Sequence, residues 1–317
     1  MNKKSLIIMS ALILVLISVL MLNRTKQNPN EMTIGILQFA SFPALDEARL
    51  GFIEQAKKDF GENIKFIEQN AQGSVVQAQA IAASFKANQN IKAFYAIATP
   101  AVMALKAEIK ERPIIFAAVT DPVGLNLNAP GTNITGTTDM ADIPEQIQIL
   151  TALIPNLKTI AILFNPAESN SSIQVKKMKE ELAKHNIKVI DAGVNSQADV
   201  AAATQFASNN AQAILAPTDN TVSSAFPIVR QVADKAKIPL ITTGTNEKDA
   251  PLMQFGVDYV QSGVQSASLL KIILLEGKKP AETEFISPSS KIYINSKELE
   301  KFKLLLPESL KNSVTLL

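Results

Sequence analysis

Short apolar runs alternate with longer segments of helical periodicity through the first part of the chain. Residues 33–37 form an uncharged, largely apolar run, which is typical of a strand buried on both faces of a sheet. The next segment begins near Pro43 and carries apolar residues three or four positions apart, which predicts an amphipathic helix. Further strands are predicted at 63–68, 93–97 and 114–119, with helices between them. This alternation predicts one doubly wound α/β lobe.

The same alternation begins again near residue 159 and predicts a second lobe. Residues 159–164 repeat the character of the first strand, and the pattern continues to a strand at 239–241. One later element departs from a simple tandem, because a strand at 254–257 is followed by a long helix that stops at Gly277. We expect this helix to return to the first lobe, where its apolar stripe would be covered.

Periodicity also predicts which side of each helix is buried. Val75 is placed in the inward stripe of the helix that follows Ser74. Phe206 and Val260 are placed in the inward stripes of two later helices.

The segment 116–139 joins the two repeats. Its apolar strand stops at Thr120 and Asp121, and a loop rich in glycine, proline and asparagine follows before a helix marked by Asp142. Ligands of open α/β sheets lie outside the carboxyl ends of the strands, so we expect this segment to be both a crossing between lobes and a wall of the pocket. The expected domains are residues 1–31 as a signal or membrane anchor with its tether, 32–141 plus 256–279 as one ligand-binding lobe, and 142–255 plus 280–317 as the other.

Small polar residues follow nearly every predicted strand, and helices begin beside several of them. Free N–H groups and positive helix ends favour a carboxylate at such a place. Asp121, Asp219 and Asp258 offer negative charge to an ammonium group, so a zwitterionic amino acid is a suitable ligand. Phe39 and Phe42 offer apolar area, which favours an aromatic or large aliphatic side chain. The candidate ligand-binding residues are Phe39, Phe42, Asp46, Thr99, Thr120, Asp121, Asn170, Ser171, Asp219, Asn220, Thr221 and Asp258.

Several of these residues have a simpler structural interpretation, which the sequence leaves open. Asp219, Asn220 and Thr221 are residue types that cap helices, and Asp258 is placed to cap the long helix. Asp121 lies before a proline and suits an ordinary turn.

Composition excludes several other kinds of site. The 317 residues are 47% hydrophobic and 19% charged with a net charge of +2, so no basic surface for nucleic acid is expected. The chain has no cysteine and a single histidine, His185, which lies at the end of a polar helix and is expected on the surface. Thiolate catalysis and cysteine-containing zinc sites are therefore excluded, and the glycines at 131–136 lack the spacing of a phosphate loop. We expect no catalytic residue, no metal and no cofactor.

The N-terminal segment differs from the rest of the chain. Two lysines precede an apolar run of roughly 18 residues at 5–22, which suits either a secretory signal or a membrane-spanning anchor. No small-x-small cleavage pattern follows, and no cysteine is available for lipid attachment. We therefore predict export, to a periplasmic or other extracytoplasmic location, with residues 5–22 retained as an anchor in the cytoplasmic membrane.

Five short motifs give the chain a resemblance to a known family. They are residues 42–46 (FPALD), 118–124 (AVTDPVG), 133–136 (NITG), 217–221 (PTDNT) and 256–259 (GVDY). In this order the sequence resembles the ABC-transporter substrate-binding proteins that include tryptophan- and tyrosine-type binders.

The resemblance implies a type I periplasmic-binding-protein fold, with two lobes joined by a multi-strand hinge that close on a ligand. It also implies an amino acid as ligand, permease and ATPase subunits as partners, no enzymatic activity and a monomeric chain. The sequence departs from many relatives in carrying Phe42 where they have a histidine, and in lacking the lipoprotein cysteine.

Two other functions are compatible with the same fold. A ligand-sensing domain that acts in signalling without transport would share the pocket but would need an output module. An enzyme would need catalytic groups that the composition supplies poorly, with one histidine and no cysteine.

Overall fold

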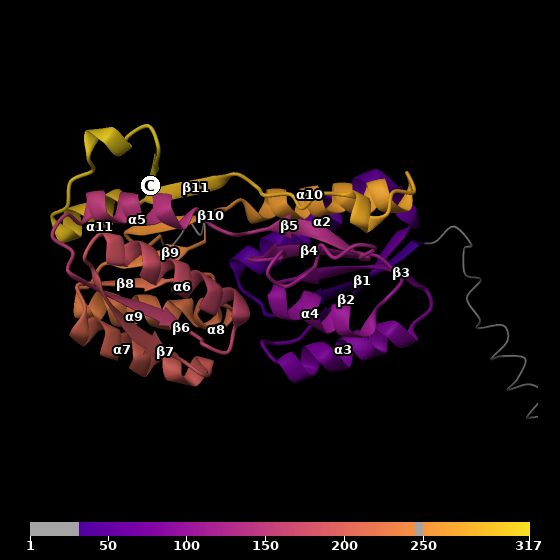
Figure 1. Ribbon diagram of the computed structural model, residues 1–317, viewed down its shortest axis with the longest axis horizontal. Helices are drawn as coiled ribbons and strands as arrows, with labels where there is room; N and C mark the ends of the chain where they lie inside the picture. Colours follow the sequence, from indigo (N-terminus) through magenta and orange to yellow (C-terminus); the bar gives the residue numbers. More distant parts are fainter. Residues whose placement is uncertain (1–31, 245–249) are drawn as a thin grey trace, which may run out of the picture.

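The computed structural model describes residues 32–244 and 250–317, which form two α/β lobes lying end to end (Figure 1). The first lobe is built on a five-stranded parallel sheet with the strand order β2-β1-β3-β4-β5. Its strands are β1 (Met32–Gln38), β2 (Ile64–Asn70), β3 (Ile91–Ile97), β4 (Ile114–Val119) and β5 (Ile134–Thr138). The helices that cover it are α2 (Pro43–Phe60), α3 (Val75–Ala87), α4 (Thr99–Glu108) and α10 (Tyr259–Leu274).

The second lobe is built on a seven-stranded sheet with the order β12-β11-β10-β9-β8-β6-β7. All its pairings are parallel except that of β10 with β11. Its strands are β6 (Thr159–Phe164), β7 (Lys188–Gly193), β8 (Ala213–Ala216), β9 (Leu240–Thr243), β10 (Met253–Val257), β11 (Ser290–Ile294) and β12 (Thr315–Leu316). Its helices are α5 (Ile143–Leu153), α6 (Ser169–Lys184), α7 (Val200–Asn210), α8 (Asn220–Ser224), α9 (Phe226–Ala236) and α11 (Ser296–Phe302). Short 3₁₀ turns occur at Gly61–Asn63, Gln197–Asp199, Pro280–Glu282 and Glu308–Leu310.

Helices cover both faces of each sheet, as expected for a doubly wound fold. In the first lobe, α2 and α10 lie on one face while α3 and α4 lie on the other (Figure 1). In the second lobe, α5 and α6 pack on one face and α7 and α9 on the other (Figure 1). Strands β3 and β4 are almost wholly buried, which explains their continuous apolar sequences.

Helix starts follow local sequence signals. Pro43 is the first residue of α2, where its missing N–H costs no hydrogen bond. Asp142 caps α5 by accepting a hydrogen bond from the N–H of Glu145 at 3.0 Å. Asp258 caps α10 in the same way, through the N–H of Gln261 at 2.9 Å.

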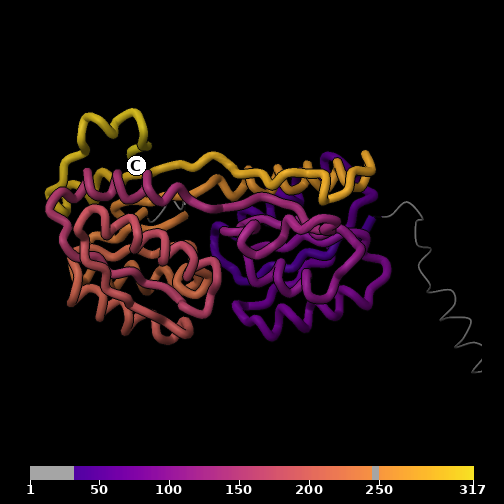
Figure 2. Tube along the Cα trace, in the orientation of Figure 1, coloured from indigo at the N-terminus to yellow at the C-terminus, as the bar shows by residue number. Residues whose placement is uncertain are grey.

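The chain crosses between the lobes three times within the described residues (Figure 2). The first crossing follows β5, the second lies between β10 and α10, and the third precedes β11. The third crossing runs beside β5, since the N–H of Thr138 donates to the Ile286 carbonyl at 2.8 Å and Ile286 donates back to Gly136 at 3.0 Å. Neighbouring hydrogen-bonded segments therefore form a multi-strand hinge.

Helix α10 packs against α2 at backbone distance. A Cβ atom added to Gly263 would lie 2.1 Å from the Ala48 carbonyl oxygen, and one added to Gly51 would lie 2.3 Å from the Val260 carbonyl oxygen. The buried hydroxyl of Ser266 donates to the Phe116 carbonyl at 3.0 Å. Glycines therefore stand where α10 and α2 approach most closely, because larger side chains there would separate the two helices.

The predictions that Val75, Phe206 and Val260 are buried were wrong. Their exposed fractions are 54%, 49% and 47%. Phe206 lies six residues after Val200, which places it about 120° around the helix axis from Val200. It therefore does not share the buried face of Val200. At Val260 the main chain of α10 meets α2 beside Gly51, and the Val260 side chain is left on the exposed side of the helix.

The anchor predicted at residues 5–22 lies outside the described residues. Among the helices of residues 32–244 and 250–317, none has the length and apolar character needed to cross a bilayer.

Candidate functional site

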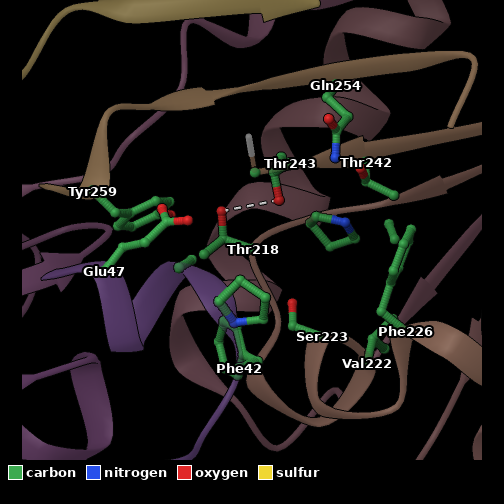
Figure 3. Close-up of a pocket in the computed structure, with 15 residues that line it drawn as sticks. Phe42, Glu47, Thr218, Val222, Ser223, Phe226, Thr242, Thr243, Gln254 and Tyr259 are labelled. Carbon is green, nitrogen blue, oxygen red and sulfur yellow. Dashed lines mark hydrogen bonds between the residues drawn. The ribbon is translucent and has the colours of Figure 1, made fainter. Parts of the chain in front are cut away.

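A pocket lies between the two lobes at the carboxyl ends of their strands (Figure 3). The first lobe contributes residues after β1 together with Tyr259, and the second contributes residues after β8 and β9. The cavity has a volume of about 80 Å³. Since a cavity of about 10–15 Å³ holds one water molecule, this pocket can hold a small organic group. It is lined by Phe42, Pro43, Ala44, Glu47, Ala216, Pro217, Thr218, Val222, Ser223, Phe226, Thr242, Thr243, Gly244, Gln254 and Tyr259.

The walls of this pocket are mostly apolar. Phe42 and Phe226 supply aromatic surface from opposite lobes, and Val222 adds aliphatic surface. Helix α2 begins at this wall without a side-chain cap. The first main-chain N–H of α2 to bond within the helix is that of Asp46, so the preceding turn leaves a positive helix end beside the pocket.

A hydrogen-bonded circuit behind the pocket joins the lobes. Tyr259 donates to Asp139 Oδ2 at 3.2 Å, and Thr120 donates to Asp139 Oδ1 at 2.9 Å. Thr120 in turn accepts a long hydrogen bond of 3.5 Å from the Gln174 amide of the second lobe. The other end of the Gln174 amide accepts from the N–H of Thr218 at 3.4 Å. Since Tyr259 and Thr218 both line the pocket, the circuit links its two sides.

Asp139 is the central carboxylate of this circuit. Burial raises the pKa of Asp139 to about 6, although the hydrogen bonds from Thr120 and Tyr259 act in the opposite direction. Burial also raises the pKa of the Tyr259 hydroxyl, and the neighbouring charge of Asp139 adds to the shift. Sequence reasoning missed Asp139. Its position directly after the strand run at 134–138 was the signal that could have identified it.

A second carboxylate cluster lies wholly within the second lobe. Asp219 accepts hydrogen bonds from the N–H groups of Asn165 at 2.6 Å and Val222 at 2.9 Å, the latter as cap of α8. Glu168 accepts from the main-chain and side-chain groups of Asn220 and Thr221 at 2.6–2.9 Å. Burial and the adjacent charge of Glu168 raise the pKa of Asp219. These bonds occupy Asp219, Asn220 and Thr221 internally, and Glu168 is a further residue that sequence reasoning missed.

Three other predicted site residues carry buried polar atoms that have no hydrogen-bond partner in the part of the chain that the structure describes. They are Thr99 Oγ1, Asn170 Oδ1 and Ser171 Oγ. The Ser171 hydroxyl is close enough to Asp219 to lower its pKa slightly, yet it makes no bond with hydrogen-bond geometry. Thr99 begins α4, and Asn170 and Ser171 lie in the first turn of α6. Buried polar atoms are rarely left unpaired, so these three are suited to a polar ligand group.

The backbone before Thr99 is strained. Ala98 has φ 82° and ψ 155°, a region that residues other than glycine seldom adopt, and Ala118 has φ 57°. Each residue lies at the carboxyl end of its strand, β3 or β4. Such strain costs about 1–3 kcal/mol and is concentrated at functional sites.

The remaining predicted site residues have mainly structural contacts. Asp46 accepts a hydrogen bond from Gln38 at 2.7 Å, and Asp121 accepts one from the N–H of Gly124 at 3.0 Å within its loop. Asp258 caps α10 and pairs with Lys291 at 3.1 Å. Partial burial would raise the pKa of Asp258, but its bond from the Gln261 N–H and the Lys291 charge together hold it below the ordinary value. Phe39 lines a second cavity of about 200 Å³, which has walls from both lobes.

No group of three or more histidine, cysteine, aspartate or glutamate side chains is arranged to hold a metal within residues 32–244 and 250–317.

Comparison with known proteins identifies the family. Residues 33–315 match the family described as ABC transporter substrate binding protein. The chain belongs to this family. Members bind a substrate for transport, so this chain is a binding protein and not an enzyme.

Individual relatives agree with this assignment. A tyrosine-binding protein from Clostridioides difficile (strain R20291) is 36% identical over 265 residues, which is 81% of this chain and 76% of the relative. The crystal structure of an ABC domain from Streptococcus pneumoniae in complex with L-Trp is 30% identical, covers 90% of this chain and 99% of its own, and has a TM-score of 0.84. A ligand-free, open substrate-binding protein with adhesive properties from Clostridium difficile is 31% identical with the same coverage, but has a TM-score of 0.66.

The two TM-scores bear on the arrangement of the lobes. Both solved structures align with the same share of this chain at nearly the same identity, so the fold of each lobe should contribute equally to both scores. The difference therefore indicates that the lobes here are arranged more as in the tryptophan complex than as in the open protein. The hydrogen bond between Thr120 and Gln174, one from each lobe, agrees with a closed cleft.

Proposed function

We propose that this protein captures an aromatic amino acid between its lobes outside the cytoplasm and delivers it to the permease and ATPase subunits of an ABC importer. The observation that carries the proposal is the pocket shared by both lobes, with aromatic walls from Phe42 and Phe226. The tyrosine-binding relative and the tryptophan complex support an aromatic ligand.

The unpaired polar atoms at Thr99, Asn170 and Ser171 suit the common part of an amino acid. The hydroxyls of Thr99 and Ser171 can donate to a carboxylate, and they stand at the positive N-terminal ends of α4 and α6. The amide oxygen of Asn170 can accept from an ammonium group. We propose that the carboxylate and ammonium groups bind here and that the aromatic ring extends into the pocket beside Phe42.

The function is tested by measuring the thermal stability of the purified chain with each of the common amino acids. A ligand at a hundred times its Kd stabilises the folded protein by about 2.7 kcal/mol, so a specific ligand should raise the Tm clearly. We expect the largest increases with aromatic amino acids. If no amino acid raises the Tm and calorimetry detects no binding, the proposed function is wrong.

The Thr99→Val variant tests the site of the carboxylate. It removes a hydroxyl and keeps the shape of the side chain, so the Tm of the ligand-free protein should change little, because this hydroxyl has no partner to lose. Affinity for the best ligand should fall about tenfold or more, the loss expected for a charge-assisted hydrogen bond. Thr204→Val is the matched control, since Thr204 is also buried but bonds the Val200 carbonyl within α7. Unchanged affinity in Thr99→Val would exclude the proposed contact.

We also propose that the protein works as a monomer held at the outer face of the cytoplasmic membrane by residues 5–22. The charge and hydropathy of that segment support the proposal. N-terminal sequencing of the exported protein tests it, and a mature chain that begins near Gln27 would contradict anchoring while leaving export intact.

A further inference from the structure

One end of the pocket carries two buried polar side chains on neighbouring strands. Thr242 of β9 and Gln254 of β10 are cross-strand partners, so both side chains project from the same face of the sheet. Both line the pocket, with exposed fractions of only 4% and 2%. Figure 3 shows them at the end of the pocket away from Glu47 and Tyr259.

Neither side chain has all its hydrogen-bonding capacity used. Within residues 32–244 and 250–317, Thr242 Oγ1 and Gln254 Oε1 both lack a hydrogen-bond partner, although leaving a buried polar atom unpaired is costly. The neighbouring hydroxyl of Thr243 differs, because it accepts a hydrogen bond from Thr218 at 3.1 Å (Figure 3). The unpaired state is therefore particular to Thr242 and Gln254 at this end of the pocket.

The charge around the pair indicates what could satisfy it. Among the described residues that line the pocket, the titratable groups are Glu47 and Tyr259, and both belong to its other end. A charged ligand group beside Thr242 and Gln254 would find no counter-charge among these described lining residues, and a charge in a largely apolar surrounding is unfavourable. A neutral group with hydrogen-bonding capacity fits.

We propose that Thr242 and Gln254 select a ligand ring that carries a hydroxyl group, as in tyrosine. This inference rests on the proposed function and names the substrate class within it. A phenolic hydroxyl can donate to Gln254 Oε1 and accept from the Thr242 hydroxyl, so one group satisfies both atoms. A phenylalanine ring would leave both unpaired, and the indole N–H of tryptophan, which only donates, could satisfy one of the two atoms but not both. Sites that hydrogen-bond a substrate hydroxyl reject the analogue that lacks it far more strongly than apolar pockets reject a missing methylene.

Calorimetry with tyrosine, phenylalanine and tryptophan tests the inference on the whole chain and on two variants. Thr242→Val keeps the shape of the side chain, and Gln254→Met keeps its approximate length and volume. The wild-type protein should bind tyrosine at least about tenfold more tightly than phenylalanine. Each variant should lose about ten- to a hundredfold in tyrosine affinity while phenylalanine affinity stays the same or improves. Each variant should weaken tryptophan less than tyrosine, because an indole N–H can donate to only one of the two side chains.

The outcomes separate this inference from the function on which it rests. Thr204→Val is the control for removing a buried threonine hydroxyl, and all three affinities should be unchanged in it. If wild type binds tyrosine and phenylalanine equally, or if the variants weaken both alike, the pair is structural and the inference fails while the proposed function stands. If tryptophan binds most tightly and Thr242→Val has no effect on any ligand, selection of a hydroxyl is wrong. If none of the three binds to wild type, both the function and the inference are wrong.

Discussion

Single buried polar residues determine how the cleft is held together and what it can bind. Asp139 contacts side chains from two segments of the first lobe, Thr120 after β4 and Tyr259 at the start of α10. Through Thr120 it is connected to Gln174 in the second lobe. The protonation state of this one carboxyl therefore affects both the hinge and the contact between the lobes.

The raised pKa of Asp139 predicts a dependence of stability on pH. Its folded-state pKa is about 6 against an ordinary value of 3.8, so between these values the unfolded chain releases the proton and the folded chain keeps it. The free energy of unfolding contributed by this group should therefore decrease as pH rises from about 4 to about 6, by up to about 3 kcal/mol. Asp139→Asn cannot ionise, and it should be more stable than wild type above pH 6 and similar near pH 4. Urea unfolding across pH 4–8 measures the difference.

Asp191→Asn provides the control for this titration, because Asp191 is exposed and forms only a surface pair with Lys179. Its difference from wild type should be small at every pH. A pH-independent offset in Asp139→Asn would mean that Asp139 does not titrate in this window.

Helix packing determines where the second crossing is anchored in the first lobe. Helix α10 can lie on α2 only because glycines stand at the contact, with Gly263 against the main chain of Ala48 and Phe52. Ser262 and Ser266 are fully buried on the same helix and bond Thr137 and the Phe116 carbonyl. The packing of α10 thus also holds β5, which leads into the hinge.

Gly263→Ala tests this packing. The added Cβ would lie 2.1 Å from the Ala48 oxygen and 2.7 Å from the Phe52 nitrogen, both main-chain atoms that cannot rotate away. We expect a loss of about 1–3 kcal/mol in the free energy of unfolding, as for other overpacked sites, despite the better helix propensity of alanine. Gly193→Ala is the matched control, since nothing lies within 4 Å of its added Cβ. Equal stabilities of the two variants in urea unfolding would show that α10 can move away from α2 without cost.

The elements were predictable where local signals and tertiary packing agree. Pro43 and Asp142 marked helix starts correctly, because the first turn of a helix has its own sequence preferences. In α10 the hydrophobic stripe identified Ala267 and Leu270 correctly but not Val260, because at that end of the helix the main chain and not the side chain packs against α2.

The site was less predictable than the fold, because a ligand pocket combines residues from different segments. Thr99 and Ser171 could be proposed from their places at strand ends, whereas Glu168 lies in a loop whose folding alone brings it to Asn220 and Thr221. Gln254 is a polar residue within an otherwise apolar strand, and that break in the pattern was the available signal.

The arrangement of the two lobes determines whether a ligand can enter or leave. A pocket lined by both lobes, with Phe42 on one and Phe226 on the other, is complete only when the lobes are together. A ligand that contacts both lobes binds the closed arrangement better than the open one, so it must shift the population toward closure. The hinge provides the motion, since its crossings are short segments between lobes that keep their own cores.

Spin labels placed on opposite sides of the cleft would measure this closure directly. The chain has no cysteine, so cysteines introduced at Val76 and Gln197 would be its only labelling sites. Both residues are exposed; Gln197 lines the second cavity from the second lobe, and Val76 closely follows Gly73, which lines that cavity from the first lobe. With the tightest aromatic amino acid bound, the distance between the labels should shorten and its distribution narrow, because the ligand favours one arrangement of the lobes.

A pair of labels at Val76 and Lys86, both on α3, is the control for effects of the ligand on label mobility, and its distance should not change. An unchanged distance between residues 76 and 197 on ligand binding would mean that the ligand enters a cleft that is already closed, and that capture does not use the hinge.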